Sequence, residues 1–364
     1  MFLSRLGSLN SLEQLKGSAQ LAKLIGGQLA SADSVGRVVD LVEPDSIRRT
    51  IHDLYSSMKR KKVLKAPPHR IVALIIDGHE SHASYRRHCS GCLERAMQPG
   101  NPQRVQYYHK NVTAQLVFDG FRFLLDAEAQ RIGEGELGCA HRLLDRVLKS
   151  YPRAFQVVVM DALYANSVIF NKLIQNNKHG IAVLKENSEP KLSVAKGVVA
   201  KESPTCQFTR NGSQIHCWDF TKPWVQIGQG IRIVAIQETS PPIQRQRDGA
   251  EEQQPPSSWF WLSTLPAEDV PSQTFIDIAR SRWCIENEGF NELVHHWHAD
   301  HVYRHASAAI TNFWLMSMLA YNIFRAFYRR NLKEPARKGK TMLHFARLVA
   351  AELYAMVALA GVPP

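Results

Sequence analysis

The sequence predicts an α/β protein in which helices flank a mixed sheet. Two apolar runs rich in branched side chains, Ile71–Ile76 and Val157–Met160, are typical of strands that are buried on both faces. An Asp119-Gly120 pair lies between two further strand-like runs and indicates a β-hairpin. Antiparallel and parallel neighbours are therefore both expected in one sheet.

The order of the elements narrows the fold class. Three strands, a helix at about 134–150, the Val157 strand, a helix at about 167–175 and a strand at 180–185 follow the order of a ribonuclease-H-like fold. The last helix of such a fold is delayed here, and residues 187–257 contain alternating, strand-like patches. We therefore predict a β-rich insertion before the last catalytic helix. The predicted domains are a helical N-terminal region, a catalytic domain in two pieces, the insertion and a set of C-terminal helices: 1–66, 67–186 with 258–305, 187–257 and 306–364.

Composition restricts the class of protein and of partner. The chain has 364 residues and a formal net charge of +12, with a pI near 9.5, which favours a polyanionic partner. The most apolar stretch, 342–362, is interrupted by charged residues on one helical face, so it predicts a packed amphipathic helix rather than a membrane span. Six cysteines without a signal-peptide pattern predict free thiols in a reducing cytoplasm.

Two acidic residues follow the predicted buried strands. Asp77 comes directly after Ile71–Ile76, and Asp161 comes directly after Val157–Met160. The carboxyl ends of such strands are where open α/β sheets bind ligands. Either aspartate alone could instead be a turn or helix-cap residue.

A third acid, Glu286, lies within a segment that predicts one long helix from about Pro271 to Trp297. At 100° per residue Glu286 falls on the apolar face, with Arg282 one turn before it, whereas Glu288 and Glu292 are expected to point into solvent. A carboxylate on an apolar face needs compensation, which a metal ion or an ion pair with Arg282 could supply. Three carboxylates together suit magnesium or manganese.

Three short blocks carry a family resemblance. Asp77-Gly-His-Glu80, Asp161-Ala-Leu-Tyr164 and Arg282-Trp-Cys-Ile-Glu286 resemble the acidic blocks of DDE transposases of bacterial insertion sequences, of the "IS four" type. The resemblance extends from about Asp77 to Arg304. Many relatives carry a tyrosine and a lysine around the third acid, and here those positions are Ala279 and Leu293.

The resemblance implies a function and a site. It implies cleavage at transposon ends and strand transfer into target DNA, with Asp77, Asp161 and Glu286 as catalytic residues that bind two Mg²⁺ or Mn²⁺ ions. It also implies double-stranded DNA as the partner and a homodimer on that DNA. A ribonuclease-H-like nuclease that cuts without joining, and a catalytically silent DNA-binding descendant, remain alternatives.

Basic residues outside the acidic blocks are candidate DNA contacts. The run Lys59-Arg60-Lys61-Lys62 ends the N-terminal region and could contact phosphates, although such runs are often only solvated. Arg282 could clamp a phosphate, because its planar fork binds phosphate as well as carboxylate. Arg304 lies in a histidine-rich stretch that we expect to face DNA.

One cysteine pair has the spacing of a metal-binding turn. Cys89 and Cys92, with His82 and His88 nearby, could form a tetrahedral zinc site. The alternative is a loop of free thiols and surface histidines.

Overall fold

The computed structural model shows two compact units that are joined through strand β1 (Ala73–Ser84). One unit contains 1–68, 77–147 and 284–364, and the other contains 69–76 and 148–283. The structure describes residues 2, 5, 7–16, 18, 22, 23, 25–97, 104–244 and 251–360. Residues 245–250 of the predicted insertion, and part of the predicted region 1–66, lie outside the described residues.

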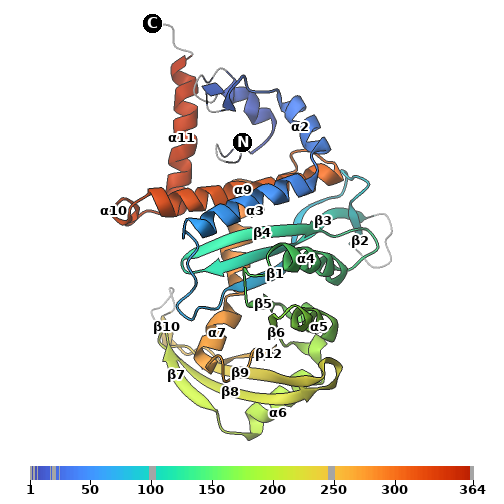
Figure 1. The fold of residues 1–364 in the computed structure, drawn as a ribbon, viewed down its shortest axis with the longest axis vertical. Coiled ribbons are helices and arrows are strands. Elements are labelled where there is room, and N and C mark those ends of the chain that lie inside the picture. The colour runs from blue at the N-terminus through green and yellow to red at the C-terminus, as the bar shows by residue number, and fades with distance from the viewer. Residues whose placement is uncertain are drawn as a thin grey trace. The chain divides into compact units, whose positions relative to one another are not determined.

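The second unit is built on a sheet that begins with parallel strands. The first residues of β1 pair in parallel with β5 (Val157–Met160), and β5 pairs in parallel with β6 (His179–Val183). An antiparallel series then continues the sheet in the order β6-β12-β9-β8-β7. Helix α5 packs on β6, and α6 packs on β9 (Figure 1). The elements not yet bounded are η2 (Ala162–Tyr164), α5 (Ser167–Gln175), η3 (Glu186–Ser188), α6 (Lys191–Lys201), β7 (Cys206–Arg210), β8 (Ser213–Trp224), η4 (Val225–Ile227), β9 (Gln229–Thr239), β10 (Ile243–Gln244), β11 (Glu251–Glu252), β12 (Ser257–Ser263) and α7 (Ser272–Arg280).

The first unit contains the antiparallel part of the sheet and most of the helices. Strand β3 pairs with β4 through the Asp119-Gly120 turn, as the sequence predicts, and β2 pairs with the first residues of β3, before the stretch that pairs with β4. Helices α3 and α9 lie side by side against β4 (Figure 1). The elements of this unit are η1 (Asn10–Leu15), α2 (Ala32–Leu41), α3 (Pro44–Arg60), β2 (Leu93–Ala96), β3 (Val105–Phe118), β4 (Phe121–Ala129), α4 (Glu136–Ser150), the π-helix η5 (Ile285–Phe290), α8 (Asn291–Trp297), α9 (Ser307–Asn331), α10 (Glu334–Arg337) and α11 (Met342–Ala360).

The strand order confirms the predicted fold class. Ten of the twelve described strands form one mixed sheet, within which β4, β3, β1, β5 and β6 are successive neighbours, and β10 pairs with β11 in a separate sheet. An antiparallel hairpin beside a parallel β1-β5-β6 core is the ribonuclease-H-like arrangement. Strands β9, β8 and β7 extend this sheet, so the β-rich residues between Glu186 and Ser257 add strands at one edge. Among the described residues, no helix combines the length and apolarity needed to cross a bilayer.

Local sequence explains where the first helices begin. The Ser31 side chain accepts a hydrogen bond from the backbone N–H of Ser34 and so caps α2. Pro44 occupies the first turn of α3, where its missing N–H costs nothing. The side chain of Asn312 on α9 donates to the carbonyls of Val39 and Val42, at 2.9 and 2.7 Å, and thus holds the end of α2.

The prediction of one long helix from Pro271 to Trp297 is wrong. The segment contains α7, a turn at 281–282, a helical pair at 283–284, the π-helix η5 and the short helix α8. A π-helix has i→i+5 hydrogen bonds and commonly occurs at functional sites. Its wider turn changes which residues share a face, so a constant step of 100° misplaces the residues after Glu286.

Gly289 permits a close approach between η5 and strand β3. A methyl group at Gly289 would lie 2.6 Å from Oε1 of Gln115, and Gln115 is fully buried and cannot swing into solvent. The backbone of η5 therefore rests against the sheet at a distance that only glycine allows.

We predict that Gly289→Ala lowers the free energy of unfolding by about 1–3 kcal/mol, because the added methyl group overpacks this contact. The matched control is Gly197→Ala in α6, where an added methyl group meets no heavy atom within 4 Å. That control should be neutral or stabilise by up to about 1 kcal/mol, because alanine is the better helix former. Urea unfolding of both variants measures the difference. Equal stability of the two would contradict the close packing of η5.

Candidate active site

Asp77 lies within β1, at the point where the parallel pairing of that strand ends. The register of β1 with β5 ends at the pair Ile76–Met160, and Asp77 and Asp161 are the next residues of the two strands. Asp77 is half-buried, and its Oδ1 accepts a hydrogen bond of 2.9 Å from the backbone N–H of Gly78. The strand itself continues to Ser84, so the prediction that the strand ends before Asp77 is wrong, whereas its parallel pairing does end there.

A stack of rings joins β1 to η5 in the first unit. The His79 imidazole lies 4.6 Å from the Phe290 ring and 5.1 Å from the Trp314 ring, stacked on both. Asp77 and His79 are two residues apart, so they share one face of the strand. Glu286 and Phe290 are four residues apart on the helical segment, so they also share a face. Strand β1 and the π-helix η5 therefore pack against each other on the faces that also carry Asp77 and Glu286.

Asp161 lies in a cavity of the second unit. This cavity of about 200 Å³ is lined by Asp161, Lys185, Arg282 and three tryptophans, among other residues. Lys185 Nζ lies 3.2 and 3.4 Å from the two carboxylate oxygens of Asp161. Among the described residues the Asp161 side chain caps no N–H of η2, although the residue stands at the N-cap position. Its carboxylate thus faces a cation rather than the helix.

The three tryptophans give this cavity an aromatic wall. Trp259 and Trp283 meet edge to face, with ring centroids 5.0 Å apart, and Trp261 is buried below them. The sequence identified Arg282 as a candidate but not Lys185. The order of residues gave no signal for Lys185, because only the folded sheet brings the segment after β6 to Asp161.

Glu292 is not the solvated residue that the helical wheel predicts, whereas the side chain of Glu288 is 40% exposed and lies beside two arginines. Glu288 lies 3.4 Å from Arg122 and 3.9 Å from Arg325. Glu292 is largely buried, and this burial raises the pKa of its carboxyl group above the usual range. The correction follows from the π-helix, which rotates the later residues of the segment relative to an α-helix.

A second set of acids in the first unit has a purely structural arrangement. Asp126 on β4 is buried between Arg48 Nε of α3 at 3.0 Å and Arg146 Nε of α4 at 2.6 Å. Glu128, two residues further, lies 3.0 Å from Arg142 and 2.7 Å from Arg146. These arginines neutralise both acids and tie β4 to α3 and α4.

The predicted DNA-contacting residues occupy different environments. Lys59, Arg60, Lys61 and Lys62 are all exposed at the end of α3 and just beyond it. Arg282 lines the Asp161 cavity. Arg304 forms an ion pair with Asp40 of α2 and is partly exposed.

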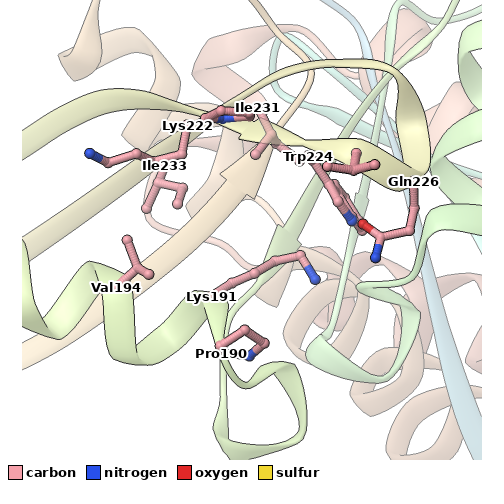
Figure 2. A pocket seen from close by; sticks show the side chains of 10 residues that line it. Pro190, Lys191, Val194, Lys222, Trp224, Gln226, Ile231 and Ile233 are labelled. Carbon is pink, nitrogen blue, oxygen red and sulfur yellow. The ribbon is translucent and has the colours of Figure 1, made fainter.

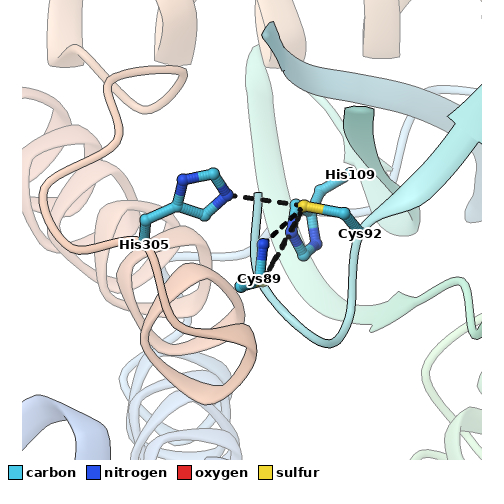
Figure 3. Close-up of side chains that lie close together, drawn as sticks. All are labelled: Cys89, Cys92, His109 and His305. Carbon is cyan, nitrogen blue, oxygen red and sulfur yellow. Dashed lines mark hydrogen bonds between the residues drawn. The ribbon is translucent and has the colours of Figure 1, made fainter. Parts of the chain in front are cut away.

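Four metal-ligand side chains gather elsewhere in the first unit. Cys89, Cys92, His109 and His305 place one ligand atom each within 4.8 Å of all the others (Figure 3). The two cysteines are those that the sequence suggested for zinc. His109 and His305 stand where His82 and His88 were expected, because β3 and the segment before α9 bring them to the cysteines. His88 instead stacks on Tyr107, with ring centroids 4.7 Å apart.

Burial sets the protonation of this group. It lowers the pKa of His109 to about 4, with His82 and His305 adding to the effect. It raises the pKa of Cys92 to about 11. Both shifts follow from the cost of placing charge in a poorly solvated interior.

A further cavity lies in the β-rich part of the second unit (Figure 2). It has a volume of about 270 Å³ and a mostly apolar lining between α6 and strands β8 and β9. Lys191 Nζ lies over the Trp224 ring at 4.3 Å. The contact is a cation–π pair, and burial lowers the pKa of Lys191.

A ribonuclease-H-like sheet with acids beside its central strands defines a class of metal-dependent nucleic-acid enzymes. Comparison with known proteins narrows this class: the family model described as "Transposase DDE domain" matches residues 68–323. The chain therefore belongs to the transposase DDE domain family, a family of polynucleotidyl transferases. This membership confirms the resemblance seen in the sequence and implies a DNA substrate and a divalent metal ion.

The other comparisons add little to the family assignment. No curated protein matches the chain. Among solved structures, the NurA nuclease from Sulfolobus solfataricus is similar with a TM-score of 0.29 and 12% identity, over 77% of this chain and 95% of that chain.

The two kinds of acid should respond differently to loss of charge. We predict that Asp161→Asn changes the free energy of unfolding by less than about 1 kcal/mol, because its partner Lys185 is half exposed. Asp126→Asn should lower it by about 3–5 kcal/mol, because two arginines lose a buried partner. Chemical denaturation of both variants at neutral pH makes the comparison. A large loss for Asp161→Asn would assign this residue a structural role.

Proposed function

We propose that the chain is a transposase that cuts DNA at the ends of a mobile element and joins the freed 3′ hydroxyl to target DNA. In this proposal Asp77, Asp161 and Glu286 hold two divalent ions, Mg²⁺ or Mn²⁺. The observation that best supports the proposal is the stacking of His79 on Phe290, which holds β1 against η5. Asp77 lies on the same face of β1 as His79, and Glu286 lies on the same face of η5 as Phe290. Family membership supplies the class of reaction.

The spacing of residues along β1 and η5 supports a shared site for Asp77 and Glu286. Asp77 and His79 point to the same side of β1, because side chains two apart on a strand share a face. Glu286 and Phe290 are about one turn apart on the π-helix η5, so they lie on similar sides of it. Acids that share these faces with a stacked pair of rings can approach each other.

The register between β1 and β5 supports the inclusion of Asp161 in the proposed site. Asp77 and Asp161 each follow a member of the last parallel pair, Ile76 and Met160. Neighbouring strands lie about 4.8 Å apart, so residues one step beyond a register pair are within reach of a shared ion.

The donor set fits the proposed ions. All three side chains offer carboxylate oxygens, which suit Mg²⁺ and Mn²⁺ better than softer metals. Asp161 has the ammonium group of Lys185 near both of its oxygens, a position that a bound divalent ion would take in its place. When bound, two such ions activate the attacking oxygen and stabilise the charge on the leaving oxygen.

The protein's own residues would bind and orient the DNA. Arg282 is placed to bind a phosphate near Asp161, since it lines the same cavity. The aromatic wall of Trp259 and Trp283 offers ring surfaces for an unpaired base. The exposed run at 59–62 adds phosphate contacts, whose number can be measured from the salt dependence of DNA binding.

Two functions compete with this proposal. A nuclease that cuts without joining would use the same acids, and a strand-transfer assay with a labelled element end separates it from a transposase. A catalytically silent DNA-binding protein is favoured by one observation, the replacement of the family's tyrosine and lysine by Ala279 and Leu293. The family also suggests that a homodimer brings two DNA ends together.

We predict that Asp77→Ala, Asp161→Ala and Glu286→Ala each abolish Mg²⁺- or Mn²⁺-dependent cleavage and strand transfer. Each should lower the rate by at least about a thousandfold, because loss of one carboxylate removes an ion that stabilises the transition state. DNA affinity should stay within about threefold of the original, since phosphate contacts come mainly from basic residues. Gel-based cleavage assays and binding assays on the same DNA measure both properties.

Asp53→Ala is the control for loss of an acid, because Asp53 is an exposed residue of α3. It should leave both cleavage and binding unchanged. Cleavage that survives in any of the three variants would exclude that acid from the reaction.

A further inference from the structure

The cluster of Cys89, Cys92, His109 and His305 lies outside the residues used for the proposed reaction. All four belong to the first unit and come from three separate parts of it. The cysteines stand in the loop between β1 and β2, His109 lies on β3, and His305 lies two residues before the start of α9. Cys92 and His109 are buried, and the other two are half-buried.

The distances in the cluster match those of a tetrahedral zinc site. Two sulfurs bound to one zinc ion lie about 3.8 Å apart, and a bound sulfur and nitrogen lie about 3.6 Å apart. Here the two Sγ atoms are 3.8 Å apart. His109 Nε2 lies 3.3 and 3.2 Å from the two sulfurs, and His305 Nε2 lies 3.4 Å from Cys92 Sγ.

The surroundings of the cysteines fit a thiolate pair. The backbone N–H of Cys89 donates to Cys92 Sγ at 3.2 Å, which stabilises negative charge on that sulfur. A tight turn closes the loop, with the N–H of Cys92 donating to the carbonyl of Cys89 at 3.1 Å. Gly91 in this turn lets the loop touch α9, since a methyl group there would lie 2.5 Å from Ser307 Oγ.

We propose that Cys89, Cys92, His109 and His305 bind one structural zinc ion. The four protein ligands complete a tetrahedral shell and leave no open position, so the ion has no catalytic role. Binding releases the two thiol protons and requires no redox partner. The ion joins the β1–β2 loop and β3 to the segment between α8 and α9, which follows the helix of Glu286. It thereby fixes the end of that segment against the strands of the first unit.

His82 is excluded from the shell although it is near. Its ring centroid lies 5.0 Å from that of His109 and 5.6 Å from that of His305, and its Nδ1 is 3.3 Å from Ser81 Oγ. It packs beside the two histidine ligands and does not replace either of them. His88, stacked on Tyr107, is the second histidine outside the shell.

The test is metal analysis of the full-length chain, purified without chelators from cells supplied with zinc. Elemental analysis should find about one zinc ion per chain. His109→Ala and His305→Ala should lose most of this zinc, whereas the matched variants His82→Ala and His88→Ala should keep it. A wild-type chain without zinc, or full zinc in His109→Ala and His305→Ala, overturns the proposal.

A second measurement covers variants that fail to fold. Cobalt added to the metal-free wild-type chain should give the intense visible bands of a tetrahedral site and a thiolate-to-cobalt charge-transfer band. A chelator that strips zinc should also lower the melting temperature of the wild-type chain. Weak octahedral cobalt bands, or a mass that shows a Cys89–Cys92 disulfide in the chain as purified under reducing conditions, overturn the proposal.

Discussion

The stacked imidazole of His79 is the contact on which the arrangement of the first unit depends. It stacks on a ring of η5 and on a ring of α9, and so joins the strand of the first acid to the segment of the third. Burial lowers the pKa of His79 to about 4, which keeps the ring neutral and suited to stacking at neutral pH. A second contact holds η5 in place, because Gly289 lets η5 approach β3 without a side chain between them.

The acidic residues fall into two groups according to the residues that neutralise them. Buried acids with a structural role, such as Asp126, are surrounded by arginines from α3 and α4. Asp161, by contrast, faces a cavity and a half-exposed lysine, which a divalent ion could replace at modest cost. The charged partners thus distinguish a structural acid such as Asp126 from Asp161, for which we propose metal binding. This distinction could not be read from the sequence, because the partners come from distant parts of the chain.

The sequence was informative where local pattern determines structure. The apolar runs before Asp77 and Asp161 and the Asp119-Gly120 turn predicted the mixed sheet, because a continuous run of branched apolar side chains and the chemistry of a turn are local properties. The π-helix was not predictable from a fixed helical period, so Glu292 was misplaced. His305 could not be paired with Cys92 from spacing, because 213 positions separate them and only the packing of α9 brings them together.

The proposed reaction requires Asp77, Asp161 and Glu286 to hold divalent ions at one point. Crystals of the chain with a DNA end, soaked in Mn²⁺ and measured at the manganese absorption edge, test this requirement most directly. Two anomalous peaks about 4 Å apart are expected, each bound by carboxylates of these three residues. Peaks bound by other side chains, or the three carboxylates facing different surfaces in the presence of Mn²⁺, would contradict it.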